Sequence, residues 1–502
     1  MKKAILLALI LGFAIFFLTS DSDAHWQHQL DKYRQIYKLL KENCPETPDT
    51  RKIVFASIHG LLKTLDPHSY FLDPPMLRSM MEDQQGNYYG IGIRITKYED
   101  RLTILSLIKD TPAFKHGLQP GDVITEIENQ STAGLPLDQI VRKLRGPKNS
   151  QVSLKVQRQG SSKPLLFRIK RAEIPLNSIS YSLSHPTSSE IGYISIRTFG
   201  KTTANEFSSN LNHLIRQQGV QGLILDLRGN SGGLLQAAIK ISDFFLEKGK
   251  TVVSIRGRNR EQKFLADKDS QFEGFPLVIL INRQSASASE IVASALKDHH
   301  KATIIGSRSW GKGLVETVHP LPLNCAIALT SAKYYTPENK SLQRDYREYD
   351  QYFSILQDDG YDHNTSLQGG VFPDIQVKDD RYPPLITELI SKGIFFQFSR
   401  KLMAAGIPIS KNFSIDATIT GKFKKFLKEK QIQFTPELFK KHVEMIQYEI
   451  KRDILTHQFS ALEGVKVFLE RDPVIRKAVG VLMKKLEKGA RTWRKQTILS
   501  SK

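Results

Sequence analysis

The middle of the chain alternates between uninterrupted apolar runs and segments with helical spacing. The apolar runs cover residues 191–196, 222–227 and 277–281. The helical segments between them cover residues 203–217 and 234–246. Strands that alternate with helices are typical of an α/β domain with a largely parallel sheet. We therefore predict an α/β core over residues 173–380.

Helical spacing also marks residues 25–85. Apolar side chains recur there at Trp26, Leu30, Tyr33, Tyr37 and Leu40. This spacing predicts an amphipathic helix, and a second helix is expected at residues 50–64, after a proline-containing break. We interpret both helices as a segment that packs on the core.

Residues 381–502 are predicted to form a further helical region. Thr435 with Pro436, and Asp472 with Pro473, have the residue types of an N-cap followed by the first helical position. The apolar stripes that follow are expected to be core or a homodimer seam, and they consist of Phe439, Val443, Ile446, Ile450, Ile454, Ile475, Val479, Leu482 and Leu486.

Residues 86–172 contain short β-rich segments separated by glycine turns. Within them, Gly90-Ile91-Gly92-Ile93 looks like the carboxylate-binding loop of a PDZ domain. Glycines at such positions let consecutive backbone N–H groups turn toward a terminal carboxylate, and the peptide tail then adds to the sheet edge. We predict a PDZ-like domain that binds protein C-terminal tails, although glycines also serve simple turns.

Residues 1–24 have the pattern of a secretory signal peptide. A pair of lysines precedes an apolar run from Ala4 to Leu18, and a polar stretch ends at Ala24. The run is shorter than the about 20 apolar residues that a membrane-spanning helix usually needs. We expect export to the periplasm or cell envelope, with an uncleaved N-terminal anchor as the alternative.

The net formal charge of +21 suggests anionic partners. Many of the basic residues lie between positions 422 and 495. They occur without a zinc-finger, RNA-recognition or helix-turn-helix signature, so we expect no specific nucleic acid. We interpret them as solvated helix faces, and contact with an anionic envelope surface or wall polymer is the alternative.

Cysteine and histidine spacing does not indicate a metal site. The chain has two cysteines, Cys44 and Cys325, and neither they nor the histidines have the spacing of zinc ligands. We predict no metal and no cofactor.

Candidate catalytic chemistry lies at residues 285–290, which read Ser-Ala-Ser-Ala-Ser-Glu before a helix-like run. A serine at a helix N-terminus suits nucleophilic attack because backbone N–H groups and the helix dipole stabilise developing negative charge. Lys312, flanked by two glycines, follows the short apolar run 302–305 and could accept the serine proton. The pattern predicts a Ser–Lys hydrolase, and tight packing of small residues is the alternative.

Seven motifs in order resemble those of the carboxyl-terminal processing proteases, a family of tail-specific serine proteases. They are Leu65-Asp66-Pro67-His68-Ser69 with Leu72-Asp73-Pro74, the PDZ-like segment, Asp226-Leu227-Arg228-Gly229-Asn230-Ser231-Gly232-Gly233, residues 285–290, Gly311-Lys312-Gly313, Ala332-Lys333-Tyr334-Tyr335-Thr336-Pro337 and Gly370-Val371-Phe372-Pro373-Asp374. The resemblance implies a nucleophilic Ser287 and Lys312 as its base. It also implies that Ser285 and Ser289 are structural or line the pocket.

A second serine, Ser231, lies in a Gly-Asn-Ser-Gly-Gly sequence like that of trypsin-like nucleophiles. The order of domains argues against this role, because trypsin-like enzymes place their PDZ unit after the serine. The family resemblance instead implies that Gly232 or Gly233 supplies one backbone donor of an oxyanion hole. The N–H of Ala288 would be the second donor.

One residue departs from the family pattern. The family usually has glutamine four residues after the lysine, where this chain has Glu316. A carboxylate beside Lys312 favours the ammonium form and opposes its action as a base. Glu316 could be protonated, could point away, or could mark a slow or inactive enzyme.

These observations predict a multi-domain α/β protein with a helical N-terminal segment, an inserted PDZ-like domain, a protease core and a helical C-terminal region. The predicted function is that of an exported serine endopeptidase, which acts on proteins with accessible C-terminal tails. The alternatives are an inactive tail-binding scaffold or chaperone, and an envelope or nucleic-acid binder that uses residues 381–502.

Overall fold

The computed structural model describes residues 27–46, 48–98, 100–258, 261–344, 369–378, 382–406 and 409–489. The chain divides into two compact units, residues 1–72 with 318–329 and residues 73–317 with 330–502. The predicted signal peptide lies outside the described residues and stays a prediction. Within the part of the chain that is described, no helix is both long and apolar enough to cross a membrane.

The first unit contains two helices and a short strand pairing. Residues 27–43 are helical, and α2 (Thr50–Lys63) begins after Asp49, whose side chain caps it. β1 (Tyr70–Leu72) pairs antiparallel with the first part of β18 (Cys325–Tyr335). Leu62, Phe71 and Cys325 form a buried apolar cluster in this unit. Both predicted N-terminal helices are therefore present.

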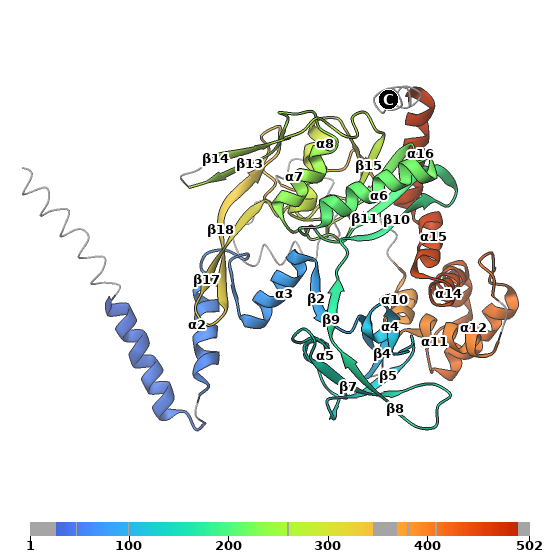
Figure 1. Cartoon of the computed structure of the whole chain (residues 1–502), viewed down its shortest axis with the longest axis horizontal. Coiled ribbons are helices and arrows are strands. Elements are labelled where there is room, and N and C mark those ends of the chain that lie inside the picture. The colour runs from blue at the N-terminus through green and yellow to red at the C-terminus, as the bar shows by residue number, and fades with distance from the viewer. Residues whose placement is uncertain are drawn as a thin grey trace, which may run out of the picture. The chain divides into compact units, whose positions relative to one another are not determined.

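A six-stranded sheet forms the core of the second unit (Figure 1). Its order is β10-β11-β12-β15-β16-β19, and the pairs from β11 to β19 are parallel, whereas β10 is antiparallel to β11. The strands are β10 (Ile179–His185), β11 (Ser188–Ile196), β12 (Gly222–Asp226), β15 (Leu277–Ile281), β16 (Thr303–Gly306) and β19 (Ile375–Gln376). The three predicted apolar runs correspond to β11, β12 and β15.

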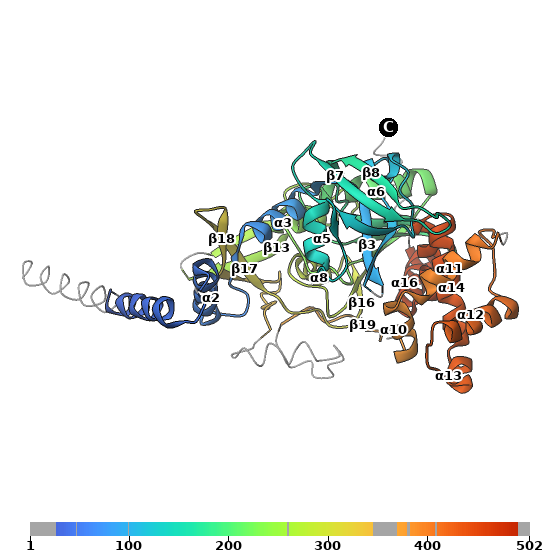
Figure 2. The same ribbon diagram turned by 90° about the horizontal axis from the view of Figure 1, so that it is seen from below.

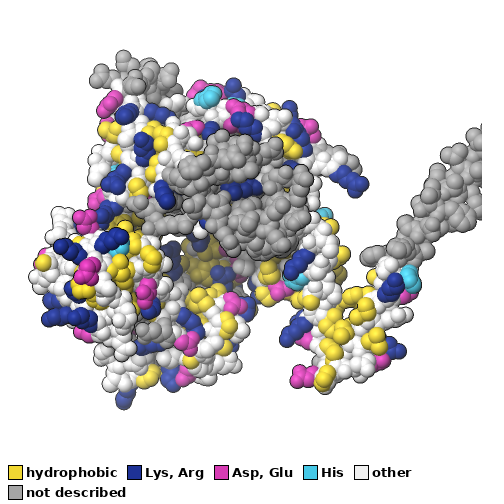
Figure 3. Space-filling view, turned by 180° about the vertical axis from the view of Figure 1, so that it is seen from behind, with side chains coloured by type: hydrophobic (Ala, Val, Ile, Leu, Met, Phe, Trp, Pro, Cys, Tyr) yellow, Lys and Arg dark blue, Asp and Glu magenta, His cyan; other side chains and the backbone are white. Residues whose placement is uncertain are grey.

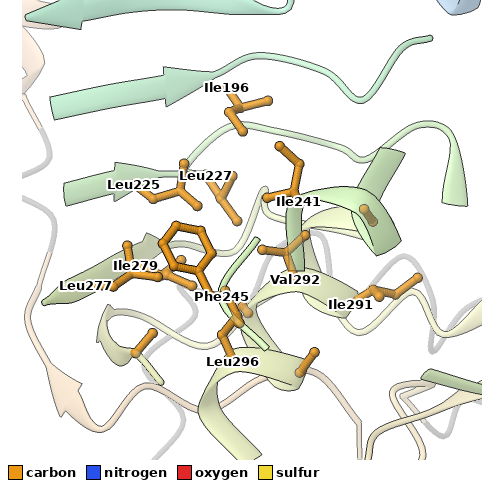
Figure 4. Packing of buried hydrophobic residues seen from close by; sticks show 14 of the residues in the cluster. Ile196, Leu225, Leu227, Ile241, Phe245, Leu277, Ile279, Ile291, Val292 and Leu296 are labelled. Carbon is orange, nitrogen blue, oxygen red and sulfur yellow. The ribbon is translucent and has the colours of Figure 1, made fainter. Parts of the chain in front are cut away.

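Three helices cover one face of this sheet, namely α6 (Thr203–Gln218), α7 (Leu235–Asp243) and α8 (Ala288–Asp298). Figure 4 shows how side chains from the sheet and the helices pack together, including Ile196, Leu225, Ile279, Phe245, Val292 and Leu296. Full burial of one such side chain contributes about 1.5–3 kcal/mol. The packing therefore fixes α8, and the segment that leads into it, against the sheet.

The other face of the sheet is covered by the C-terminal end of the chain. α15 (Ala461–Arg471) and α16 (Pro473–Gly489) contribute Leu469, Ile475 and Leu482 to a cluster with strand residues such as Tyr193, Ile224 and Val278. Parallel sheets need cover on both faces because both carry apolar side chains. The apolar stripe of α16 was expected to be either core or a homodimer seam, and the structure places it in the core.

A smaller antiparallel arrangement lies beside the lysine segment. β13 (Thr251–Gly257) pairs with β14 (Glu261–Leu265) and, through residues 254–257, with residues 332–335 of β18. β17 (Leu314–Leu321) also pairs with β18. Lys312 therefore lies in the turn that connects β16 of the parallel sheet with β17.

The β-rich module has its own sheet and core. The sheet has the order β3-β4-β5-β7-β8, with β3 at its edge. The elements of the module are β3 (Ile93–Tyr98), β4 (Arg101–Leu107), α4 (Pro112–Lys115), β5 (Val123–Ile127), β6 (Gln130–Ser131), α5 (Leu137–Leu144), β7 (Gln151–Gln157) and β8 (Leu165–Lys170). β2 (Asn87–Gly90) leads into the module and β9 (Ala172–Pro175) leads out of it, and these two strands pair with each other. α3 (Pro74–Gln85) precedes β2.

The helices after β19 form a separate apolar cluster and lie together in both ribbon views (Figures 1 and 2). They are α10 (Pro384–Ser391), α11 (Ile394–Ala404), α12 (Ala417–Glu429), α13 (Pro436–Lys441) and α14 (Val443–Gln458). Thr435 caps α13 as predicted. The apolar stripe predicted from Phe439 to Ile454 would need one continuous helix. The structure divides it between α13 and α14, because His442 leaves helical geometry (φ −111°, ψ 12°).

Basic side chains are dispersed over the surface visible in Figure 3, among acidic and apolar ones. Several C-terminal lysines pair with glutamates, as Lys392 does with Glu388 at 2.7 Å and Lys401 with Glu429 at 2.6 Å. Both lysines precede residues 422–495, and the interpretation of that stretch as solvated helix faces stays a prediction.

Candidate active site

Ser287 lies at the N-terminus of α8 in a strained backbone conformation. Its φ and ψ are 53° and −114°, and its side chain is partly exposed. Non-glycine residues with positive φ persist only where the surroundings enforce them, and they cluster at functional sites. The positive end of α8 lies beside the hydroxyl, so the position suits a nucleophile that develops an oxyanion next to it.

Glu290 connects Ser287 to the lysine turn. Its side chain is fully buried, and Oε2 accepts hydrogen bonds from Ser287 N (2.8 Å) and Lys312 N (2.9 Å). Oε1 accepts from Ser309 Oγ (2.5 Å) and Gly311 N (2.7 Å). Because one oxygen binds both backbone N–H groups, Ser287 and Lys312 are held side by side.

The environment of Glu290 acts on its charge in two directions. Burial raises the pKa of the carboxyl, and the four hydrogen bonds lower it, with burial the stronger effect. From its position three residues after Ser287, Glu290 is expected to be either a second carboxylate near the site or a first-turn acid at the helix dipole. The structure adds a positioning role that the Ser-x-x-Glu capping pattern could have indicated.

Lys312 lies between two glycines that the packing requires. A Cβ at Gly311 (φ +86°) would lie 2.3 Å from Arg344 Cγ, and one at Gly313 would lie 2.2 Å from Gln343 N. The lysine side chain is 25% exposed, and its Nζ lies 2.6 Å from Glu316 Oε1. Within the described part of the chain, no hydrogen bond joins Nζ to Ser287 Oγ. Glu316 therefore points toward the lysine, not away from it.

Glu316 also acts on a buried tyrosine. Burial together with the Glu316 carboxylate raises the pKa of Tyr334 to about 12. Tyr334 N donates to Gly313 O at 2.7 Å, which fastens β18 to the lysine turn. The phenol therefore stays neutral near the site at physiological pH.

The glycine-rich turn after β12 faces the nucleophile. A Cβ at Gly232 (φ +107°) would lie 2.8 Å from Ser287 Cβ and 3.0 Å from Ala288 N. Asn230 is fully buried and holds the turn, since its Oδ1 accepts from Gly232 N (2.8 Å) and its carbonyl accepts from Ala286 N (3.0 Å). Because the Gly232 N–H already donates to Asn230 Oδ1, the N–H of Gly233 is the better candidate for the oxyanion donor.

The neighbouring serines have different surroundings. Ser285 and Ser289 are fully buried, and their hydroxyls donate to Leu227 O (2.8 Å) and Asn230 O (2.9 Å). Both side chains tie the segment before α8 to the glycine-rich turn. Ser231 is exposed on that turn. Among the three serines of residues 285–289, Ser287 alone is partly exposed.

The predicted tail-binding residues belong to the β-rich module. Gly90 ends β2, Ile91 is buried in the module's core, and Ile93 begins β3. Gly92 has φ +82°, and a Cβ there would lie 2.4 Å from Thr111 Oγ1. Only glycine fits this position, which turns the backbone into the edge strand of the sheet.

Two segments of the chain match known protein families. Residues 190–352 match peptidase family S41, and residues 103–158 match the PDZ domain. The carboxy-terminal-processing protease of Bartonella bacilliformis is 37% identical over 331 residues, 65% of this chain and 75% of that protein. Carboxy-terminal processing protease CtpB of Bacillus subtilis is 35% identical over 327 residues, 65% of this chain and 68% of that protein.

A solved structure, titled photosystem II D1 C-terminal processing protease, matches at 29% identity and a TM-score of 0.38, covering 69% of this chain and 86% of that chain. The two sequence relatives carry the assignment, because most of their length is shared with this chain at above 30% identity. The predicted resemblance, fold class and enzyme class are confirmed. The chain belongs to the carboxy-terminal-processing proteases of peptidase family S41, serine peptidases, and it includes a PDZ domain.

Proposed function

We propose that the protein is an exported endopeptidase that captures C-terminal tails of proteins on its PDZ domain and cleaves them with Ser287 and Lys312. The observation that carries the proposal is the shared Glu290 oxygen, which binds the backbone N–H groups of both residues. Ser287 adds a strained backbone, a partly exposed position and a helix N-terminus.

In the proposed reaction, an uncharged Lys312 Nζ removes the hydroxyl proton as Ser287 Oγ forms a bond to the peptide carbonyl carbon. The carbonyl oxygen becomes an oxyanion that accepts hydrogen bonds from Ala288 N and Gly233 N. The C–N bond then breaks, and the Lys312 ammonium gives its proton to the leaving amine. In the second half of the reaction, Lys312 Nζ removes a proton from water as the water oxygen attacks the acyl carbon. The bond from that carbon to Ser287 Oγ then breaks, and the lysine returns the proton to Ser287.

Tail capture would use the loop of residues 90–93 and the β3 edge. Backbone N–H groups of the loop would bind the terminal carboxylate, and the tail would add to β3 as an antiparallel strand. The edge position of β3 and the glycine-only site at Gly92 support this role. Export would depend on residues 1–24, whose lysine pair and apolar run are typical of a signal peptide.

The test is cleavage of an unfolded reporter protein with an apolar C-terminal tail, followed by mass spectrometry. We expect Ser287→Ala and Lys312→Ala to abolish cleavage. Matched controls are Ser294→Ala, a buried serine further along α8, and Lys340→Ala, an exposed lysine paired with Glu338. Full activity of either site variant would reject the dyad.

A second candidate function is a tail-binding scaffold with little or no catalysis. The Lys312–Glu316 ion pair favours it, because a carboxylate at 2.6 Å stabilises the ammonium that cannot act as a base. If Glu316 only hampers the lysine, Glu316→Gln should increase the cleavage rate. A wild-type protein that binds tails without cutting any would support the scaffold.

A further inference from the structure

Asp472 directly precedes the C-terminal helix α16, and its two carboxylate oxygens have different partners. Oδ1 accepts from Val474 N and Ile475 N, both at 2.9 Å, and so caps the helix. Oδ2 lies 2.9 Å from Arg228 Nη1. One side chain thus joins the start of the last described helix to the segment that follows β12.

Arg228 is the centre of a buried charge cluster. Its Nη2 lies 2.7 Å from Asp226 Oδ2, which also accepts from Tyr193 OH at 2.8 Å. The Arg228 backbone N–H donates to Asp226 Oδ1 at 3.0 Å. The side chains of Arg228, Asp226 and Asp472 are 11%, 6% and 9% exposed. Buried ion pairs of this kind are weak evidence for stability, because desolvation offsets much of their attraction.

The position of the cluster suggests what it does instead. Arg228 lies two residues before Asn230 and four before Gly232, which contacts the nucleophile. The next N–H along the turn, that of Gly229, donates to Asn282 Oδ1 at 3.0 Å. The segment from Asp226 to Gly233 is therefore fixed on one side by the nucleophile segment and on the other by the C-terminal helices.

We propose that Asp472 is a positioning residue for catalysis, which acts through Arg228 to hold the glycine-rich oxyanion turn against Ser287. The inference rests on the proposed Ser–Lys function and extends it to the C-terminal helical region. Asp472 then supports the catalytic apparatus through Arg228 without itself touching the substrate.

The test uses the full-length protein and two variants, Asp472→Asn and Asp472→Ser. Both side chains still cap a helix, but neither carries the charge that meets Arg228. We expect kcat for a mapped cleavage peptide to fall by about tenfold to a hundredfold, the range for a small misplacement of catalytic groups. KM should stay unchanged, and a peptide aldehyde that mimics the tetrahedral state should bind more weakly by the same factor as kcat falls.

The matched control is Asp416→Asn. Asp416 caps α12 by accepting from Ile419 N at 2.8 Å and has no ion pair with the turn in the described structure. A double variant, Asp472→Asn with Arg228→Gln, tests whether Asp472 acts through Arg228 or through a general loss of stability. If Asp472 acts through Arg228, adding Asp472→Asn to Arg228→Gln should reduce kcat no further.

The outcomes distinguish this inference from the proposed function. An active Ser287→Ala protein would overturn both. With Ser287→Ala inactive, unchanged kcat in both Asp472 variants would overturn this inference alone, as would a rise in KM without a fall in kcat. An equal fall in the Asp416 control would also overturn it, because the effect would then be general to helix capping.

Discussion

Replacement of Glu290 tests how the catalytic residues are held together. Its carboxylate accepts four hydrogen bonds, two at each oxygen, from Ser287 N, Lys312 N, Ser309 Oγ and Gly311 N. In Glu290→Gln, one oxygen becomes an amide NH₂ that cannot accept from a donor. The less costly orientation puts the NH₂ toward Ser309, because a hydroxyl can turn and accept whereas a backbone N–H cannot.

In that orientation the remaining oxygen still binds the N–H groups of Ser287 and Lys312, and the main loss is the bond to Gly311 N. A buried N–H without a partner costs about 1–3 kcal/mol, so Glu290→Gln should destabilise the protein by about this amount and keep part of its activity. Glu290→Ala removes both acceptor oxygens and with them all four hydrogen bonds. We expect it to abolish cleavage. The backbone bond from Trp310 N to Ser285 O (2.9 Å) still joins the two segments, but no acceptor then sets Lys312 N against Ser287 N.

The assay combines urea unfolding with kcat for a mapped cleavage peptide, measured on the wild type and both variants. Ser294→Ala is the matched control, since it changes a buried polar side chain of the same helix away from the turn. If folded Glu290→Ala cleaved as fast as the wild type, the carboxylate would not position the site. Equal rates for Glu290→Gln and Glu290→Ala would refute the orientation argument.

Three further predictions concern the space around Gly232, the space around Gly92 and the raised pKa of Glu290. Gly232→Ala should lower kcat by about a hundredfold, because its Cβ would lie 2.8 Å from the nucleophile's Cβ, whereas Gly219→Ala has open space and should keep full activity. Gly92→Ala should weaken tail binding measured by calorimetry but spare cleavage of tail-less peptides, because its Cβ would meet Thr111 at 2.4 Å. The raised pKa of Glu290 means that the folded state keeps a proton that the unfolded chain has released, so its contribution to stability falls as pH rises above 4.5. The stability of the wild type relative to Glu290→Gln should therefore be greater at pH 4.5 than near neutrality, and the opposite slope would contradict the raised pKa.

Much of the fold follows from local sequence. The apolar runs at 222–227 and 277–281 are buried on both sides, as continuous hydrophobic runs in parallel strands usually are. Asp472 before Pro473 begins a helix because side-chain capping and proline geometry are local effects. Residues of the candidate site were predictable for a similar reason, since Ser287 and Lys312 lie in turns that follow strands of one sheet.

Other features depend on contacts that a single sequence does not reveal. The Asp472–Arg228 ion pair joins positions far apart in the chain, and neither residue has a local pattern that names its partner. The break at His442 arises although the apolar spacing continues, because Phe439 and Ile446 both enter the same cluster from separate helices. Periodicity indicates which side chains are buried, but it does not indicate where tertiary packing interrupts the backbone.

The candidate site is assembled from three turns that follow the adjacent strands β12, β15 and β16. Each turn is tied to another by a polar side chain that binds backbone groups. Asn282 binds Gly229 N, Ser289 binds Asn230 O, and Glu290 binds the lysine turn. The apolar core places the strands, but it cannot set the turns to the tenths of an ångström that nucleophile and oxyanion donors require. Apolar substitutions that preserve volume should therefore change stability more than kcat, and substitutions at these three polar residues should do the reverse.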